Sequence, residues 1–298
     1  MHRRQFLKTS AAICAVSPVF SDSLLHAQET TDLAVVKNGE PAALVRNAVD
    51  ALGGMSRFVN KNDVVVLKPN ISWDRVPPQA ATTNPESVAE VVKMCLESGA
   101  SKVIIFDNTL NEPRRCYKRS GIQAAAEAAG ADVQHVHERK FKRVAFPEGK
   151  LIRNWEVYDE LLEADTLINM PAAKHHSISG VSLGMKNLMG VLGGVRGKIH
   201  RQFDTKLVDI NTLVRPKLTI LDAYRMLLRN GPSGGNPADV ALTRTVVAGT
   251  DPVAVDSYGV TLFGLDPLKT GFLVEASARQ LGQNRLDKLN IRTIALNS

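Results

Sequence analysis

Between Lys174 and His200 the chain concentrates residues that can do chemistry. Three of its seven histidines, three lysines and six glycines fall in these 27 residues. Imidazoles bind protons, metals and anions, and a desolvated amine can act as a base or nucleophile. Glycine allows the backbone to approach a ligand closely. This composition is unsuited to a hydrophobic core, and it predicts a site for an anion, a metal or a cofactor.

Two amines of this segment, Lys174 and Lys186, are candidate catalytic groups. If folding brings them near each other or near Lys68, mutual repulsion and partial burial lower a lysine pKa and create a usable base or nucleophile. The alternative is that each lysine is permanently paired with a carboxylate. The candidate partners are Asp107, Asp222 and Asp251.

The histidines allow a second kind of chemistry. His176 and His200 can ligate a transition metal through neutral imidazole, with Asp107 or Asp222 completing the ligand set. They can equally hydrogen-bond a phosphate or carboxylate, and His176 is also a candidate catalytic residue. Adjacent side chains of an extended strand point to opposite faces, so only one of His175 and His176 is expected to face a ligand.

The elements that position these groups follow a regular alternation. Apolar runs typical of buried strands alternate with helical patterns, which predicts an α/β fold with a mainly parallel sheet and helices on both faces. We expect strands at 33–36, 63–67, 102–106, 133–136, 166–169, 218–221, 245–248 and 291–295. We expect helices at 41–52, from Pro85 to just before Gly99, and at 122–129, 207–213, 253–263 and 271–280, with a hairpin within 139–153.

Polar groups follow five of the predicted strands. In open α/β sheets ligands bind beyond the carboxyl ends of the strands, so these groups are expected to converge on one crevice. For Asp251 the alternative is that it only caps the helix beginning at Pro252. The candidate ligand-binding residues are Lys68, Asn70, Asp107, Asn187, Asp222 and Asp251.

The N-terminus has the layout of an export signal. Arg3-Arg4 precedes an apolar stretch over 11–20 and a small-residue cleavage site ending at Ala27. This pattern indicates a twin-arginine signal over residues 1–27, although an ordinary secretory signal shares the layout. The apolar stretch is shorter than the roughly 20 residues of a membrane span. We therefore expect an exported, periplasmic protein that uses the twin-arginine machinery and has no stable membrane insertion after cleavage.

The rest of the chain is expected to form one domain. No linker-like segment interrupts residues 28–298, which predicts a single α/β domain. The formal net charge of +7 is modest for 298 residues, and no basic run is interleaved with aromatics. Nucleic-acid binding is therefore not predicted, and the local positive charges suit a small anionic ligand.

Cysteine usage argues against one class of cofactor. Only Cys95 and Cys116 lie beyond the signal, and no C-x-x-C motif occurs, so an iron-sulfur cluster is not expected. Cys95 lies at helical spacing from apolar residues and is expected in the core. Cys116 is expected in a solvated loop. A disulfide between the two is left open.

Several motifs, read in order, resemble one family. They are Lys68-Pro69-Asn70, Thr82-Thr83-Asn84-Pro85, Gly99 to Val103 ending in Asp107, Lys174-His175-His176, Lys186 to Gly190, Asn230-Gly231-Pro232 and Asp251 to Asp256. Together they resemble the family called domain of unknown function 362, over most of the chain after the signal. Some members carry cysteine-rich iron-sulfur segments, which this sequence lacks.

The order His176, Lys186, His200 also resembles the arrangement in nickel-pincer lactate racemases. That resemblance implies that Lys186 holds a nucleotide-derived cofactor, that His200 ligates the metal and that His176 acts as acid or base. The sequence thus predicts a metal- or cofactor-dependent enzyme acting on an anionic small molecule, with a transition metal or a covalently held cofactor. The alternative is a non-catalytic periplasmic binding protein for a small anion.

Overall fold

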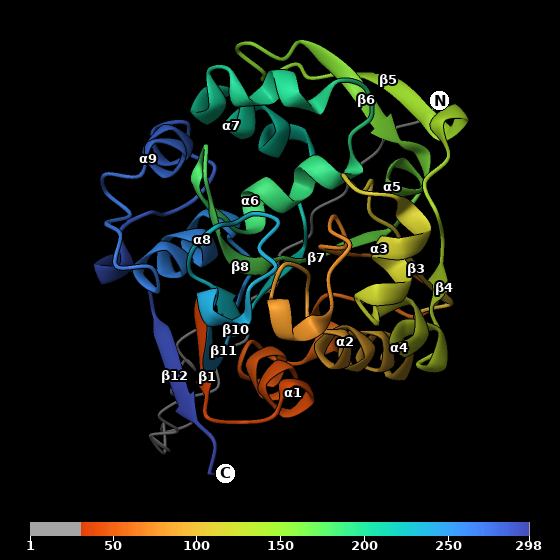
Figure 1. The fold of residues 1–298 in the computed structure, drawn as a ribbon, viewed down its shortest axis with the longest axis vertical. Helices are drawn as coiled ribbons and strands as arrows, with labels where there is room; N and C mark the ends of the chain where they lie inside the picture. Colours follow the sequence, from red (N-terminus) through yellow and green to blue (C-terminus); the bar gives the residue numbers. More distant parts are fainter. Residues whose placement is uncertain (1–30, 298) are drawn as a thin grey trace, which may run out of the picture.

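The computed structural model describes residues 31–297 and has the expected α/β fold (Figure 1). The strands are β1 (Leu33–Lys37), β2 (Val64–Pro69), β3 (Lys102–Ile105), β4 (Asp132–Val133), β5 (Phe141–Ala145), β6 (Asn154–Tyr158), β7 (Thr166–Met170), β8 (Ala172–His176), β9 (Gly180–Ser182), β10 (Leu218–Leu227), β11 (Val240–Gly249) and β12 (Ile291–Ala295). The helices are α1 (Pro41–Ala51), α2 (Pro85–Glu97), α3 (Pro113–Arg119), α4 (Ile122–Ala128), α5 (Asp159–Leu162), α6 (Gly184–Asn187), α7 (Phe203–Leu213), α8 (Pro252–Thr261) and α9 (Gly271–Ala278).

One large, mainly parallel sheet organises the molecule. Its strand order is β12-β1-β11-β10-β7-β2-β3-β4, with β8 paired to β10 and β9 paired to β8. Strands β2, β3, β4, β7 and β10 run parallel, whereas β11 runs antiparallel to both of its neighbours. The mainly parallel sheet is therefore confirmed. The strands that run against their neighbours are β11 and also β9, which is antiparallel to β8.

Helices cover both faces of the sheet, as expected. One apolar core joins the sheet to α1, α2, α3 and α4, and the other joins it to α6, α7, α8 and α9. In β2, Val65 and Leu67 contribute to the first core while Val66 contributes to the second. Such a strand is buried on both faces, which explains its continuous apolar sequence.

The start of α2 follows from its sequence. Asn84 is extended, and its side chain accepts a hydrogen bond from the Glu86 backbone N–H at 2.9 Å. Pro85 occupies the first turn, where its missing N–H is not needed. Gly99 follows the helix with φ of +95°, a conformation that favours glycine. The predicted helix is confirmed, with its cap.

Three local expectations were wrong. Cys116 is buried on α3 rather than in a solvated loop, because Glu112 caps this short helix and Pro113 begins it. The second strand of the hairpin begins at Asn154, beyond the predicted 139–153. Strands β10 and β11 are longer than predicted because they pair with each other over most of their lengths. Cys95 and Cys116 are both free, so no disulfide joins them.

The expected export signal over residues 1–27 lies outside the described residues. Between residues 31 and 297, no helix combines the length and the apolar character needed to cross a bilayer.

Candidate active site: a basic pocket at the carboxyl edge of the sheet

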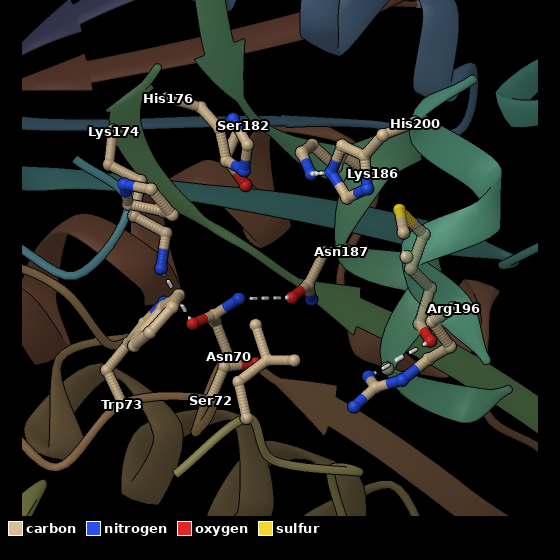
Figure 2. Close-up of a pocket in the computed structure, with 15 residues that line it drawn as sticks. Asn70, Ser72, Trp73, Lys174, His176, Ser182, Lys186, Asn187, Arg196 and His200 are labelled. Carbon is tan, nitrogen blue, oxygen red and sulfur yellow. Dashed lines mark hydrogen bonds between the residues drawn. The ribbon is translucent and has the colours of Figure 1, made fainter. Parts of the chain in front are cut away.

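A pocket of about 130 Å³ lies where the carboxyl ends of the parallel strands meet the loops that follow them (Figure 2). Among the described residues that line it, none is an aspartate or glutamate. The basic residues in its wall are Lys174, His176, Lys186, Arg196 and His200. An excess of positive charge in a concave site attracts anions. The pocket is therefore suited to a small anionic ligand.

Different elements supply these groups. Lys174 and His176 lie on β8, which continues the chain from β7 after Pro171. Lys186 lies on the short helix α6. Arg196 and His200 begin and end a 3-10 helix. The five residues thus come from one continuous segment, as the concentration of histidine, lysine and glycine predicted.

Lys186 and His200 form the pair of pocket residues best placed for nucleophilic chemistry. Nζ of Lys186 lies 3.1 Å from Nε2 of His200. Burial, together with the positive charge of Arg196, lowers the pKa of Lys186 to about 8. Among residues 31–297, no carboxylate forms an ion pair with Lys186, so nothing opposes this shift. A substantial fraction of the amine is therefore neutral near neutral pH, which makes it a candidate nucleophile.

The protonation pattern of His200 follows from its contacts. Burial and the charge of Lys186 lower its pKa, and a hydrogen bond with the Gly197 backbone opposes the shift. Nζ of Lys186 donates whenever the amine is protonated, so in that state Nε2 of His200 accepts and the neutral ring carries its proton on Nδ1. Neutral His200 therefore presents the lone pair of Nε2 to the Lys186 amine, as a base would.

His176 has the opposite arrangement. Its Nδ1 accepts hydrogen bonds from the backbone N–H groups of Ile178 and Ser179, at 3.1 and 3.3 Å. A ring nitrogen that accepts carries no proton, so the neutral ring holds its proton on Nε2. Burial and the charge of Lys186 lower the pKa of His176 to about 3, which keeps the ring neutral. His176 is thus a fixed hydrogen-bond donor that stacks on His200, with 5.5 Å between ring centroids.

The adjacent histidine, His175, points away from the pocket. Its Nδ1 accepts a hydrogen bond from the Gly231 backbone at 3.2 Å, in the loop between β10 and β11. Only His176 of the pair lines the pocket. This difference follows from the alternation of side chains along β8, and that His176 faces a ligand stays a prediction.

A chain of amides holds Lys174 in place. Its Nζ donates to Oδ1 of Asn70 at 2.9 Å and to the Ala81 carbonyl. Asn70 in turn donates to Oδ1 of Asn187 at 3.0 Å. Burial is the main cause that lowers the pKa of Lys174 to about 7. Lys174 is therefore a second amine that forms no ion pair with a carboxylate of residues 31–297, and it is fixed at the pocket wall (Figure 2).

Asn187, although it lines the pocket, has no hydrogen-bonding capacity left for a ligand. Its Oδ1 accepts from Lys68 and Asn70, and its Nδ2 donates to the Lys68 carbonyl and to Oδ1 of Asn169. An amide group can donate two hydrogen bonds and accept two. Its expected role in ligand binding is therefore corrected to that of a residue that positions Asn70 and Lys68.

Lys68 and Asp107 form a buried ion pair behind the pocket. Their side chains are fully buried, and Nζ lies 2.8 Å from Oδ1. Asp107 also accepts from the Ile71 backbone and the Ser72 hydroxyl, which fixes the loop that carries Ser72 to the pocket wall. Permanent pairing, one of the two alternatives for the lysines, thus holds for Lys68. Both residues support the pocket without lining it, which corrects their expected contact with a ligand.

Asp222 and Asp251 do not reach the pocket. Asp222 accepts from the Asn84 backbone at 2.6 Å and from the Tyr224 backbone at 3.0 Å, which anchors the start of α2. Because β11 is antiparallel, its carboxyl end lies at the opposite edge of the sheet from the pocket. Asp251, which follows β11, caps α8 by accepting from Val253 and Ala254. The capping alternative therefore describes Asp251.

Comparison with known proteins identifies the family of this chain. The family model for the domain of unknown function DUF362 matches residues 65–261, well over half of the chain. This chain belongs to the DUF362 family. Its likeness to the thylakoid-associated protein sll1697 of Synechocystis sp. amounts to 27% identity over 274 residues, which cover 89% of this chain and 81% of the relative.

A solved structure gives a more distant likeness. The lactate racemase apoprotein from Thermoanaerobacterium thermosaccharolyticum aligns over 78% of this chain and 57% of its own, with 12% identity and a TM-score of 0.46. This chain thus spans little more than half of that protein. The match is too distant to transfer the role of any residue to this DUF362 protein.

The donor set of the DUF362 pocket does not fit a metal held by protein side chains. Within the described part of the chain, no group of three histidine, cysteine, aspartate or glutamate side chains is placed to hold a metal ion. The expected carboxylate ligands, Asp107 and Asp222, are occupied elsewhere. A metal-ligating histidine usually donates through its other ring nitrogen, whereas Nδ1 of His176 accepts. The expected ligand pair His176 and His200 is therefore incomplete.

Two residues that support or line the site were not predicted. Asp256 on α8 accepts from the backbone N–H groups of Gly184 and Met185, at 2.7 and 2.8 Å, and so holds the start of the helix that carries Lys186. An aspartate within the apolar run 253–260 was the available signal, because a buried carboxylate needs partners. Arg196, between Gly194 and Gly197, lay inside the segment already singled out.

Proposed function

We propose that this DUF362 protein is an enzyme that binds a small anionic molecule in the basic pocket and uses the Lys186 amine as its reactive group. The observation that carries the proposal is the contact between Nζ of Lys186 and Nε2 of His200, 3.1 Å apart, in a pocket wall without carboxylates. A partly neutral amine beside an imidazole lone pair is the arrangement of an activated nucleophile.

The remaining groups suit the binding of an anion. Arg196 donates to the carbonyls of Thr109 and Met189, and no carboxylate among residues 31–297 forms an ion pair with it. Its guanidinium retains further N–H groups for an anion. His176 contributes an Nε2–H donor, and Lys174 a positive charge when protonated. A planar guanidinium is especially suited to a carboxylate or phosphate.

A non-catalytic binding protein for a small anion is the competing function. Anion binding alone gains from fully charged amines, whereas burial here makes Lys186 easier to deprotonate and so weakens its attraction for an anion. This feature supports the enzyme. Lys186→Arg keeps the positive charge and removes the nucleophile. We expect this variant to bind phosphate about as well as the wild type in calorimetry, while the amine chemistry that the wild type shows at Lys186 is lost. Phosphate binding by both proteins, with no amine chemistry in either, would favour the binding protein.

A cofactor held covalently at Lys186 is a different use of the same amine. The sequence resemblance implied it, and a neutral amine would suit such attachment. Intact-mass measurement of protein purified through its native export route separates the two versions. The calculated mass of the mature chain supports direct action of Lys186, and added mass located at Lys186 supports the cofactor.

Export is part of the proposal. The paired arginines and apolar stretch within residues 1–27 support passage through the twin-arginine machinery into the periplasm. Sequencing the N-terminus of the mature protein tests this, with cleavage after Ala27 as the expected result. Replacement of Arg3-Arg4 by two lysines should retain the precursor in the cytoplasm, whereas unchanged export would indicate an ordinary secretory signal.

A further inference from the structure

We propose that the substrate class is a small 2-oxo carboxylate, whose carbonyl carbon forms an imine with Nζ of Lys186. This inference rests on the proposed function and narrows it. It draws on three features of the pocket: the environment of the amine, the opposite hydrogen-bonding roles of the two histidines, and the size and charge of the cavity.

The amine is placed for addition to a carbonyl. Lys186 lines the pocket, and its Nζ has Nε2 of His200 as a neighbour at 3.1 Å. The start of α6 is fixed by the two backbone hydrogen bonds to Asp256, so the lysine extends from an anchored helix. A pKa of about 8 leaves part of the amine neutral at neutral pH. A carbonyl carbon is the electrophile that such an amine attacks most readily.

The two histidines complete the proton transfers. His200 accepts the proton that the attacking nitrogen loses, and Nε2–H of His176 donates a hydrogen bond to the oxygen on which negative charge develops. The C–N bond forms as the C=O π bond breaks, which gives a carbinolamine. The oxygen then leaves as water with both amine protons, and a C=N bond joins the substrate to Lys186. No oxidant, reductant or co-reactant is needed, and water reverses the step.

The size and charge of the cavity indicate which 2-oxo acid fits. Its volume of about 130 Å³ is close to the roughly 150 Å³ of an engineered cavity that binds benzene, a molecule of six non-hydrogen atoms. A three-carbon 2-oxo acid has the same number of non-hydrogen atoms. Its carboxylate matches the guanidinium of Arg196, and its carbonyl group is adjacent to that carboxylate. A phosphate ion would use the charge of the pocket and leave the nucleophile without a function.

The test traps the imine. The full mature protein is incubated with pyruvate and sodium cyanoborohydride, and the adduct is located by intact mass and peptide mapping. We expect one adduct per chain, on Lys186. The matched variants are Lys186→Arg, which should lose the adduct, and Lys198→Arg, which changes an exposed lysine of the same segment and should retain it. His200→Asn should slow trapping.

The possible outcomes separate the inference from the proposed function. If pyruvate binds in calorimetry but no adduct forms on Lys186, or if adducts spread evenly over exposed lysines, the oxo-acid inference is overturned and anion binding stands. If neither pyruvate nor phosphate binds to the wild-type protein, the proposed function itself fails. An adduct confined to Lys186 and lost in Lys186→Arg supports both.

Discussion

The reactivity of the Lys186 amine across pH is open to direct measurement. Burial and the nearby charge of Arg196 lower its pKa to about 8, compared with about 10.4 for a free lysine side chain. At pH 7.4 about 20% of an amine with a pKa near 8 is neutral, against roughly 0.1% of a free lysine amine. The neutral, reactive fraction is therefore about 200-fold larger.

Competitive labelling with trace acetic anhydride measures this fraction. The label on the peptide that contains Lys186 is followed by mass spectrometry from pH 6 to pH 11, with free Nα-acetyl-lysine as the internal standard. We expect an inflection near pH 8 for Lys186. Restricted access to the pocket lowers the rate at every pH without moving the inflection, so the two effects are separable. An inflection near that of the standard would refute the electrostatic account of the site.

A variant checks the cause of the shift. Arg196→Gln removes a positive charge that lowers the pKa of Lys186, so the inflection should move to higher pH. Arg201→Gln removes an exposed arginine from the same segment and should leave the inflection in place. An identical shift in both variants would mean that net charge, rather than the position of Arg196, controls the amine.

Three further predictions concern the groups behind the pocket. Lys68→Met leaves the buried Asp107 carboxylate without its ion pair, which should lower the free energy of unfolding by about 3–5 kcal/mol in urea titrations. A decrease below about 1 kcal/mol would contradict the buried pair. In Gly190→Ala the new Cβ would lie 2.0 Å from Oδ1 of Asp107, so we expect the free energy of unfolding to fall by about 1–3 kcal/mol or more. Gly197→Ala has open space at its Cβ and should be near neutral. Equal effects of the two substitutions would contradict the close contact at Gly190. Burial raises the pKa of Asp256 to about 7, so the folded state binds this proton more tightly than the unfolded state does. The stability that the protonated Asp256 contributes is therefore fully present below about pH 4 and falls as pH rises toward 7. Wild type should therefore lose more stability between pH 5 and pH 8 than Asp256→Asn, and parallel profiles would refute this.

The sequence located the site because parallel strands bring their carboxyl ends to one edge. Lys68 and Lys174 lie at this edge because β2, β7 and β8 share a direction in the sheet. Lys186 reaches it on α6, which follows the antiparallel strand β9. Strand direction itself is not readable from an apolar run. The residues 245–248 have the same pattern whether β11 is parallel or antiparallel, so the placement of Asp251 could not be predicted.

The chemistry of each group depends on contacts that residue types do not encode. His176 and His200 are the same residue type, yet backbone N–H groups donate to Nδ1 of His176, whereas the Lys186 amine lies against Nε2 of His200. Similarly, three lysines approach the site, but only Lys68 has a carboxylate partner among the described residues. Pairing and tautomer are set by tertiary packing, which a one-dimensional pattern does not contain.

The central claim is that the Lys186 amine reacts within an anion-binding pocket. The most direct measurement is a crystal structure of the mature protein soaked with pyruvate and reduced with cyanoborohydride. The account predicts continuous density from Nζ of Lys186 to the second carbon of the ligand, with the carboxylate on the Arg196 guanidinium. Pyruvate bound elsewhere on the molecule, or bound in the pocket with Nζ turned away from its carbonyl carbon, would contradict it.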